Sequence, residues 1–301
     1  MRTPDLNWIK DPRVFQVNRL QASSDHIYTI GKDKKPSSFS LNGTWKFNLS
    51  KNYDSCFKFF YNTEFNDSNW NDIQVPGHIQ LQGFDKPHYT DVTYPWDGHD
   101  VVKPGQIDMD KNKVYQYRKT FDCPQDFIGN KLILSFEGVE SNIYVWLNGK
   151  FIGYAEDSFT PSRFDITKYT QEKDNVLCVR IFQKCTGTWL EDQDMWRFTG
   201  LFRDVMIYKQ PSLHIQDLKI DTDIDLDTNK SVLSCVCKMS SNESHTLQAK
   251  LYDPQGNIVW NGNMQDSFEI PVENTCLWSS EFPNLYQLEL VLYDTNNEII
   301  E

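Results

Sequence analysis

The densest group of chemically active side chains lies in the run Gly187–Asp204. Three carboxylates, those of Glu191, Asp192 and Asp194, lie within four positions of one another. Three large rings interleave with them and two arginines follow: Trp189, Trp196, Phe198, Arg197 and Arg203. Carboxylates accept hydrogen bonds from hydroxyl groups, and aromatic faces stack on the apolar face of a sugar ring. The run indicates either a carbohydrate site or a buried structural turn in which the acids pair with the arginines.

A second polar stretch, between residues 78 and 100, has the composition of a metal site. It contains His78, His88, His99, Asp85, Asp91, Asp97 and Asp100. Their spacing fits no recognised zinc motif, which favours a histidine-containing loop without metal. In the same stretch, Tyr94-Pro95-Trp96 is either part of a sugar-site wall or a packed loop anchor.

The elements that must position these side chains are strands. Short alternating or β-branched runs, broken by Asn, Gly, Asp and Pro, are typical of an all-β protein. Asn148-Gly149 predicts a two-residue hairpin turn, because both residues tolerate positive φ. Trp45, Trp146 and Trp260 lie on or beside expected strands and are predicted to be in the core. The strands expected from the pattern are 131–137, 142–147, 175–183, 205–208, 214–220, 231–239, 246–252, 258–260 and 286–293.

A domain boundary is expected near Gln210-Pro211, because proline interrupts strand pairing and the sequence pattern then changes. We expect one domain over residues 1–210 and an immunoglobulin-like sandwich over residues 211–301. The final strand, Leu288–Tyr293, is followed by a turn and only a short return segment, Glu298–Glu301. This pattern predicts a sandwich that is incomplete at its last strand and exposes a strand edge able to pair with another chain.

Composition excludes several classes of partner. The chain has 301 residues and a net charge of −12, which argues against nucleic acid or an anionic membrane as the main partner. Its amino terminus lacks the apolar stretch of a secretory signal, and no apolar run approaches the roughly 20 residues of a membrane helix. Seven irregularly spaced cysteines indicate reduced thiols and a cytoplasmic location. Cys235 and Cys237 alternate with polar residues and are expected to face the core.

Five segments, taken in order, resemble the amino-terminal part of glycoside hydrolase family 2 β-galactosidases. They are SLNGTWKF (40–47), VPGHIQLQGFDKPHYTDVTYPWDG (75–98), FEGVESNIYVWLNGKFIGYAEDSFTPSRFDIT (136–167), GTWLEDQDMWRFTGLFRDV (187–205) and LWSSEFPNLYQLELVLYD (277–294). The resemblance covers essentially the whole chain. The general pattern is most similar to the large subunit of two-chain bacterial β-galactosidases.

The resemblance implies a jelly-roll sugar-binding domain over residues 1–210, followed by the immunoglobulin-like sandwich. In the family a catalytic (β/α)₈ barrel comes next, and such a barrel needs about 250 residues. No barrel is expected here, so no residue of this chain is assigned as a catalytic glutamate. In the family, two glutamates of the barrel catalyse the reaction by a retaining mechanism, with their carboxyl groups about 5–5.5 Å apart. The family's magnesium ligands are likewise expected outside this chain.

The resemblance also assigns two binding residues. Asp194 matches a family carboxylate that binds galactose and helps to ligate a sodium ion, and a carboxylate can do both through its oxygens. Asp91 matches a position where the family usually has a sugar-contacting Asn. An ionised Asp only accepts hydrogen bonds, which puts ordinary galactoside affinity in doubt. For Glu191 and Asp192 we expect a structural role, in the turn and in pairing with Arg197 or Arg203.

These observations lead to three functional hypotheses. The first is the sugar-binding and scaffold portion of a β-galactosidase that hydrolyses terminal β-galactosides such as lactose, with the barrel in another part of the enzyme or in a partner chain. The second is a galactoside-binding module without catalysis, and the third is a non-functional truncation product. Under the first hypothesis the isolated chain is expected to be inactive and the assembled enzyme to be a homo- or hetero-oligomer.

Overall fold

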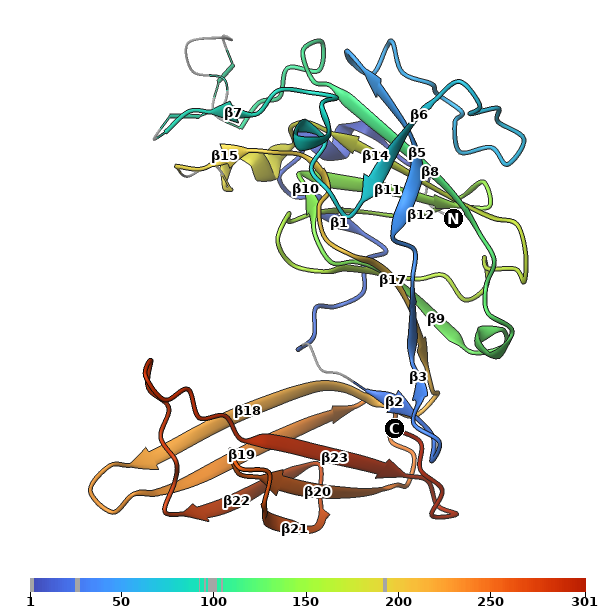
Figure 1. Ribbon diagram of the computed structural model, residues 1–301. Coiled ribbons are helices and arrows are strands. Elements are labelled where there is room, and N and C mark those ends of the chain that lie inside the picture. The colour runs from blue at the N-terminus through green and yellow to red at the C-terminus, as the bar shows by residue number, and fades with distance from the viewer. Residues whose placement is uncertain are drawn as a thin grey trace. The chain divides into compact units, whose positions relative to one another are not determined.

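The computed structural model describes residues 3–24, 28–91, 93–94, 96, 102–103, 105–191 and 194–301. These residues form two compact units (Figure 1). The first unit comprises Met1–Ala22 and Ser38–Lys209, and the second comprises Ser23–Ser37 and Gln210–Glu301. All the regular structure is β apart from four short 3₁₀ helices, so the all-β prediction is confirmed and no (β/α)₈ barrel occurs in the described ranges.

Each unit consists of two separate stretches of the chain, whereas we expected one continuous stretch for each. Residues 23–37 pack with the second unit and not with the rest of residues 1–210. The Ser24 N–H donates to Asp217 Oδ1 at 2.7 Å, and the Gly31 N–H donates to the Ile300 carbonyl at 3.0 Å. This segment also carries a hairpin of β2 (Thr29–Ile30) and β3 (Lys35–Pro36). Hydrogen bonds over long sequence separations, which local pattern does not reveal, attach it there.

The first unit is a two-layer sandwich. One layer is a seven-stranded sheet in the spatial order β1 (Gln16–Val17), β12 (Lys150–Glu156), β11 (Asn142–Leu147), β14 (Asn175–Phe182), β8 (Val114–Phe121), β5 (Gly43–Ser50) and β6 (Asn71–Val75). The other layer contains β13 (Ser162–Asp165), β9 (Lys131–Phe136), β17 (Val205–Gln210) and β4 (Ser38–Ser40). Two short ribbons complete it, β10 (Val139–Glu140) with β16 (Gly200–Leu201), and β7 (His88–Tyr89) with β15 (Trp196–Arg197).

The seven-stranded sheet is buried on both faces. Leu177, Val179 and Ile181 of β14 lie in the core between the two layers. Val176, Cys178 and Phe182 lie on the opposite face, in a second core that also contains Ile9, Phe60 and Trp146. The strand predicted over residues 175–183 is thus confirmed as β14, with successive residues on opposite faces. Every residue of β14 is consequently buried, including the charged Arg180.

The predicted turn at Asn148-Gly149 joins β11 to β12, with φ angles of 50° and 74°. Trp45 and Trp146 are buried as predicted, each 1% exposed, while Trp260 packs against the core of the second unit as a partly buried residue. The four helices are η1 (Leu6–Lys10), η2 (Gln80–Gln82), η3 (Gln125–Phe127) and η4 (Thr186–Trp189). None of these, and no other helix in the described ranges, has the length and apolarity required to cross a membrane.

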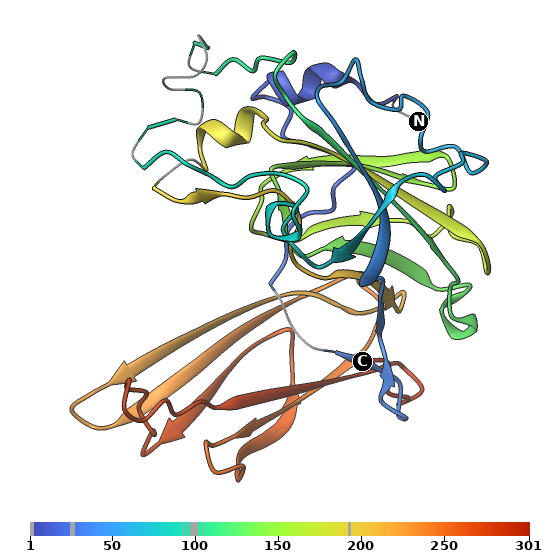
Figure 2. The same ribbon diagram turned by 45° about the horizontal axis from the view of Figure 1, so that its top comes forward.

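The second unit is a sandwich of two three-stranded sheets (Figures 1 and 2). The first sheet has the order β18 (Ile215–Asp225), β19 (Lys230–Met239) and β22 (Ser267–Glu273). The second has the order β21 (Ile258–Met264), β20 (Thr246–Tyr252) and β23 (Gln287–Tyr293). Cys235 and Cys237 face the core as predicted, with their sulfur atoms 3.8 Å apart.

Three strands of this unit differ from the expectation, and one of them is β21, which extends beyond Trp260 to Met264. The strand β22 was missed, although Phe268, Ile270 and Val272 alternate cleanly toward the core. β18 extends beyond Ile220 to Asp225, because its acidic outer residues pair with β19 in a long hairpin. After β23, Ile300 N–H donates to the Leu292 carbonyl and Leu292 N–H donates to the Glu301 carbonyl, both at 2.8 Å. The short return segment that the sequence predicted is therefore present.

Phe164 tests the core between the layers of the first unit. The side chain is fully buried, so Phe164→Ala should lower the free energy of unfolding of this unit by about 3–5 kcal/mol through lost burial and a cavity. Phe59 is 66% exposed, and Phe59→Ala should change it by less than about 1 kcal/mol. Urea denaturation followed by tryptophan fluorescence measures both, and equal effects would contradict the burial described here.

Candidate functional site

The two candidate binding residues are brought together by the ribbon of β7 and β15. Tyr89 lies opposite Trp196, and His88 lies opposite Arg197. Just beyond the ribbon, the Asp194 N–H donates to the Asp91 carbonyl at 3.1 Å. Both views show the segment that carries β7 running beside the one that carries β15 (Figures 1 and 2). Residues more than one hundred positions apart in sequence thus share one edge of the first unit.

Local backbone geometry allows this approach. Asp91 has a φ of 52° and Asp194 a φ of 35°, both in the left-handed region. Aspartate enters that region more readily than most residues, because its short side chain bonds to nearby backbone. Aspartate at both positions therefore suits the two tight turns as well as the chemistry of the site.

The Asp194 carboxylate is exposed and held in place. Tyr89 donates its hydroxyl hydrogen to Asp194 Oδ1 at 2.7 Å. This hydrogen bond, together with the carboxylate charge, raises the pKa of Tyr89 to about 12. The Tyr89 ring stacks on Trp196 with the ring centroids 5.3 Å apart, and these rings are 48% and 54% exposed. An oriented carboxylate beside two exposed aromatic faces has the chemistry of a carbohydrate-binding surface.

Trp189 and Trp96 serve as an anchor for the neighbouring loop. Their rings stack with centroids 4.2 Å apart, Trp96 is 2% exposed, and the Trp189 indole donates to the Gln106 carbonyl. Tyr94 packs on Trp189 but remains 41% exposed. Of the two interpretations of this stretch, the loop anchor applies to Trp96. Pro95 lies outside the described residues.

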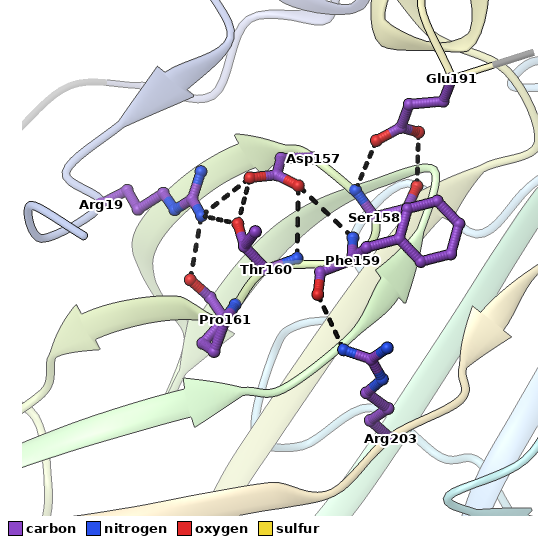
Figure 3. Close-up of polar contacts among 8 residues, drawn as sticks. All are labelled: Arg19, Asp157, Ser158, Phe159, Thr160, Pro161, Glu191 and Arg203. Carbon is purple, nitrogen blue, oxygen red and sulfur yellow. Dashed lines mark hydrogen bonds and ion pairs between the residues drawn. The ribbon is translucent and has the colours of Figure 1, made fainter. Parts of the chain in front are cut away.

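Glu191 has a structural role, but its hydrogen-bond partners are not the arginines we expected. Its carboxylate accepts hydrogen bonds from the Ser158 N–H at 2.7 Å and from the Ser158 hydroxyl at 2.6 Å (Figure 3). Arg203 instead donates to the Phe159 carbonyl at 2.7 Å. Burial lowers the pKa of the Arg197 guanidinium, and the negative charges of Glu140 and Glu191 partly oppose this shift. Asp192, the other acid given a structural role, lies outside the described residues.

The loop that carries Ser158 is tied down from several sides (Figure 3). Arg19 forms an ion pair with Asp157 at 3.4 Å and donates to the Thr160 hydroxyl and the Pro161 carbonyl at 3.0 and 2.9 Å. Asp157 in turn accepts from the backbone N–H groups of Phe159 and Thr160. Glu191 lies three positions before Asp194 in the sequence, so this network holds the chain at a point close in sequence to Asp194.

A buried carboxylate anchors the same turn at its base. Glu156, at the end of β12, accepts from the Thr186 hydroxyl at 2.9 Å and from the Gly187 N–H at 2.7 Å. A Cβ at position 187 would lie 3.0 Å from the Glu156 carboxylate, so glycine allows the close approach. Burial raises the pKa of Glu156, and it raises that of Glu140, near Arg197, to about 8. The sequence analysis did not identify four residues that support the candidate site, because their role is visible only from the residues they contact. These are Glu140, Glu156, Arg19 and Tyr89.

The histidine-rich stretch contains no metal-binding cluster of His, Cys, Asp or Glu among its described residues. The ring of His78 packs against Phe198 and Phe202, with centroids 4.7 and 5.3 Å apart. Asp85 accepts from Lys113 and from the Tyr115 hydroxyl. These contacts account for His78 and Asp85 as parts of a packed loop. His99, Asp97 and Asp100 lie outside the described residues.

The first unit is thus a β-sandwich that presents an exposed, oriented carboxylate beside two exposed aromatic rings, a combination with the chemistry to contact a sugar. The family described as "Glycosyl hydrolases family 2, sugar binding domain" matches residues 39–211. The family described as "Glycosyl hydrolases family 2" matches residues 213–301. The chain belongs to glycosyl hydrolase family 2.

Its relatives carry consistent names. The chain is 45% identical to a β-galactosidase of Halalkalibacterium halodurans, over 99% of this chain and 31% of that protein. It is 40% identical to a β-galactosidase large subunit of Leuconostoc lactis, over 99% of this chain and 51% of that protein. The chain therefore spans about a third to a half of the length of these curated relatives.

Solved structures support the fold. The β-glucuronidase of Lactobacillus rhamnosus matches with a TM-score of 0.68 at 17% identity, over 93% of this chain and 45% of that one. An uncultured Clostridium β-glucuronidase matches with a TM-score of 0.64 at 20% identity, over 93% and 45% of the two chains. At such identities the likeness concerns the fold alone.

Replacing Asp194 tests its contact with Tyr89. In Asp194→Asn the pKa of Tyr89 should fall from about 12 toward the ordinary value of about 10, because the negative charge no longer disfavours the phenolate. Asp91→Asn should lower it less, since Asp91 acts only through its charge. Nuclear magnetic resonance of ring-labelled tyrosine, assigned with Tyr89→Phe, follows the titration. An unchanged pKa in Asp194→Asn would contradict the contact.

Removing the Glu191 carboxylate tests the support of the turn. Glu191→Ala loses two hydrogen bonds from Ser158 to a charged acceptor, so local opening of this loop should become easier by about 1.5–3 kcal/mol. Amide hydrogen exchange at Ser158 should accelerate by at least about tenfold, whereas the exposed Glu172→Ala should leave it unchanged. Equal exchange in the two variants would show that Glu191 does not hold the loop.

Proposed function

We propose that this chain forms the sugar-binding and scaffold part of a β-galactosidase that hydrolyses terminal non-reducing β-D-galactosides such as lactose. The observation that carries the proposal is the juxtaposition of Asp91 and Asp194 beside Tyr89 and Trp196. The names of the relatives, β-galactosidase and β-galactosidase large subunit, supply the substrate class. The activity belongs to the assembled enzyme and not to this chain by itself.

The described residues suggest how the sugar is held. Tyr89 orients the Asp194 carboxylate, which can then accept hydrogen bonds from sugar hydroxyls with its remaining lone pairs. Asp91 adds a second acceptor close by, although its negative charge repels that of Asp194. The exposed rings of Trp196 and Tyr94 can cover the apolar face of the sugar. Two acceptors and adjacent rings favour a ligand that is rich in hydroxyl donors.

Under this proposal, bond cleavage depends on groups outside the chain. Retaining hydrolysis uses an acid/base carboxyl group and a nucleophilic carboxylate about 5–5.5 Å apart. We propose that both lie on a (β/α)₈ barrel, in another part of the polypeptide or in a partner chain. The large-subunit relatives from Leuconostoc lactis and Latilactobacillus sakei support an enzyme assembled from two polypeptides. Enclosure between barrel and sandwich would also remove water from the sugar.

The proposed sodium ion fits this chain in chemistry but not in number of ligands. Hard cations are held by several oxygen ligands, and Asp194 offers carboxylate oxygens at an exposed position. No group of three His, Cys, Asp or Glu side chains surrounds it among the described residues. We therefore propose that Asp194 contributes one ligand, with the other ligands coming from the barrel. Such an ion would offset the repulsion between Asp194 and Asp91.

Complementation tests the proposed function. The chain should hydrolyse no o-nitrophenyl β-galactoside by itself, and hydrolysis should appear when it is co-expressed with the remaining part of the Halalkalibacterium halodurans relative. Asp194→Ala should then lower kcat/KM by about 10- to 150-fold, the equivalent of about 1.5–3 kcal/mol for hydrogen bonds to a charged group. Asp72→Ala, which removes an exposed ion pair with Lys46, should change it less than about threefold. Hydrolysis by the isolated chain, or none after co-expression, would contradict the proposal.

A further inference from the structure

The ribbon of β7 and β15 has two different faces. Tyr89 and Trp196 lie opposite each other and are exposed, close to Asp194. The neighbouring pair, His88 and Arg197, is partly buried and lines a small cavity on the inner side of the ribbon. Successive residues of a strand point to opposite faces, so the outer face carries the candidate binding groups and the inner face is packed. The position of the outer face therefore depends on what holds the inner one.

The cavity behind the ribbon is small and polar. It encloses about 20 Å³, which is room for one water molecule and too little for a sugar. Besides the ribbon, the strand β10, the helices η2 and η4 and the segment after β14 contribute lining residues. These include Glu140, Gln80, Thr188 and Lys184. A space of this size and polarity serves the packing of the ribbon and not the binding of a ligand.

Glu140 is linked to the ribbon through the backbone as well as through the cavity. In β10 it pairs with Gly200 of β16, and β16 begins three residues after Arg197, the last residue of β15. Between these strands, the Thr199 N–H donates to Gln80 Oε1 at 3.0 Å, and Gln80 Nε2 donates to Thr199 Oγ1 at 2.8 Å. The chain is therefore fixed immediately after Arg197, whose side chain lines the same cavity as that of Glu140.

The Glu140 carboxyl group is buried, and none of the described residues donates a hydrogen bond to it. A buried charge without donors is costly, so the neutral, protonated form is favoured. Burial raises the pKa of Glu140 to about 8; the Arg197 charge opposes this shift and the Glu191 charge adds to it. Among the described residues, His88 and Lys184 are the other titratable groups that line the cavity. Glu140 therefore holds a proton at neutral pH and loses it in mildly alkaline solution.

We propose that Glu140 is a positioning residue for the candidate binding surface. Its carboxyl group acts on the inner face of the ribbon through the Arg197 guanidinium, and loss of its proton shifts Trp196 and Tyr89 on the outer face. The physical reason is that the new negative charge arises in a buried space, where its attraction for a cation is only weakly screened by water. The importance of this shift for galactoside binding rests on the proposed function, whereas the shift itself does not.

Nuclear magnetic resonance of the full chain tests the inference without requiring catalysis. The indole N–H resonance of Trp196, assigned with Trp196→Phe, should move with pH in the wild type with a midpoint of about 8. In Glu140→Gln, which keeps the size and the neutral charge of the protonated group, this titration should be lost. Glu137→Gln is the matched control, because the Glu137 carboxylate accepts from the Ser135 hydroxyl, and this variant should retain the titration. No titration in the wild type, or the same titration in Glu140→Gln, would overturn the proposal.

Two further variants identify the route from Glu140 to the outer face. Arg197→Met removes the cation and should reduce the amplitude of the Trp196 titration by at least about threefold, and an undiminished amplitude would overturn the proposal. His88→Gln should keep the midpoint of about 8, because a histidine ordinarily titrates at about 6.5. Loss of the titration in His88→Gln would assign the proton to the histidine and would overturn the proposal as well.

The same resonance separates this inference from the proposed function. A Trp196 titration that depends on Glu140, without hydrolysis by the co-expressed enzyme, would count against the proposed function alone. Hydrolysis by the co-expressed enzyme, without such a titration, would count against this inference alone.

Discussion

Burial of the seven-stranded sheet on both faces is the constraint on which the first unit depends. A strand such as β14 must be apolar on two faces. Its one cationic side chain, Arg180, is buried against aromatic rings and is stabilised there because it donates to backbone carbonyl groups. A sheet packed in this way cannot shift its register without exposing a whole face. The loops that leave its strands therefore begin from fixed points. That rigidity is what allows a turn at the edge of the sheet to present a single carboxylate in one orientation.

The candidate site depends on this rigidity through a short series of polar contacts. Glu156 at the end of β12 holds the backbone at Gly187, and Glu191 holds the backbone and hydroxyl of Ser158. Burying a carboxylate is costly unless hydrogen bonds compensate, and each of these acids accepts at least two. The acids that stabilise the turn are therefore distinct from the exposed Asp194, which accepts from Tyr89 at the surface. One acidic run thus contains a supporting carboxylate and an exposed one, distinguished by burial and partners.

The second unit is packed less completely than the first. Its core is complete around β19 and β20, where Cys235, Leu247, Ala249 and Leu251 are fully buried or nearly so. At its open side, apolar side chains of β18 and β23 line a groove in place of a packed interior. Both units thus present chemically specific surfaces, one polar with aromatic rings and one apolar with open strand edges.

The sequence by itself determined the all-β class, most of the strands of six residues or more, and the turn at Asn148-Gly149. These follow from alternation and from turn residues, which act over a few neighbouring positions. It also singled out Asp91 and Asp194, through motifs that resemble a family. Only the tertiary structure decided that Glu191 bonds to Ser158, that Tyr89 orients Asp194, and that residues 23–37 pack with the second unit. Each of these depends on contacts between segments far apart in the chain, and local sequence pattern carries no information about which distant partner a side chain will meet.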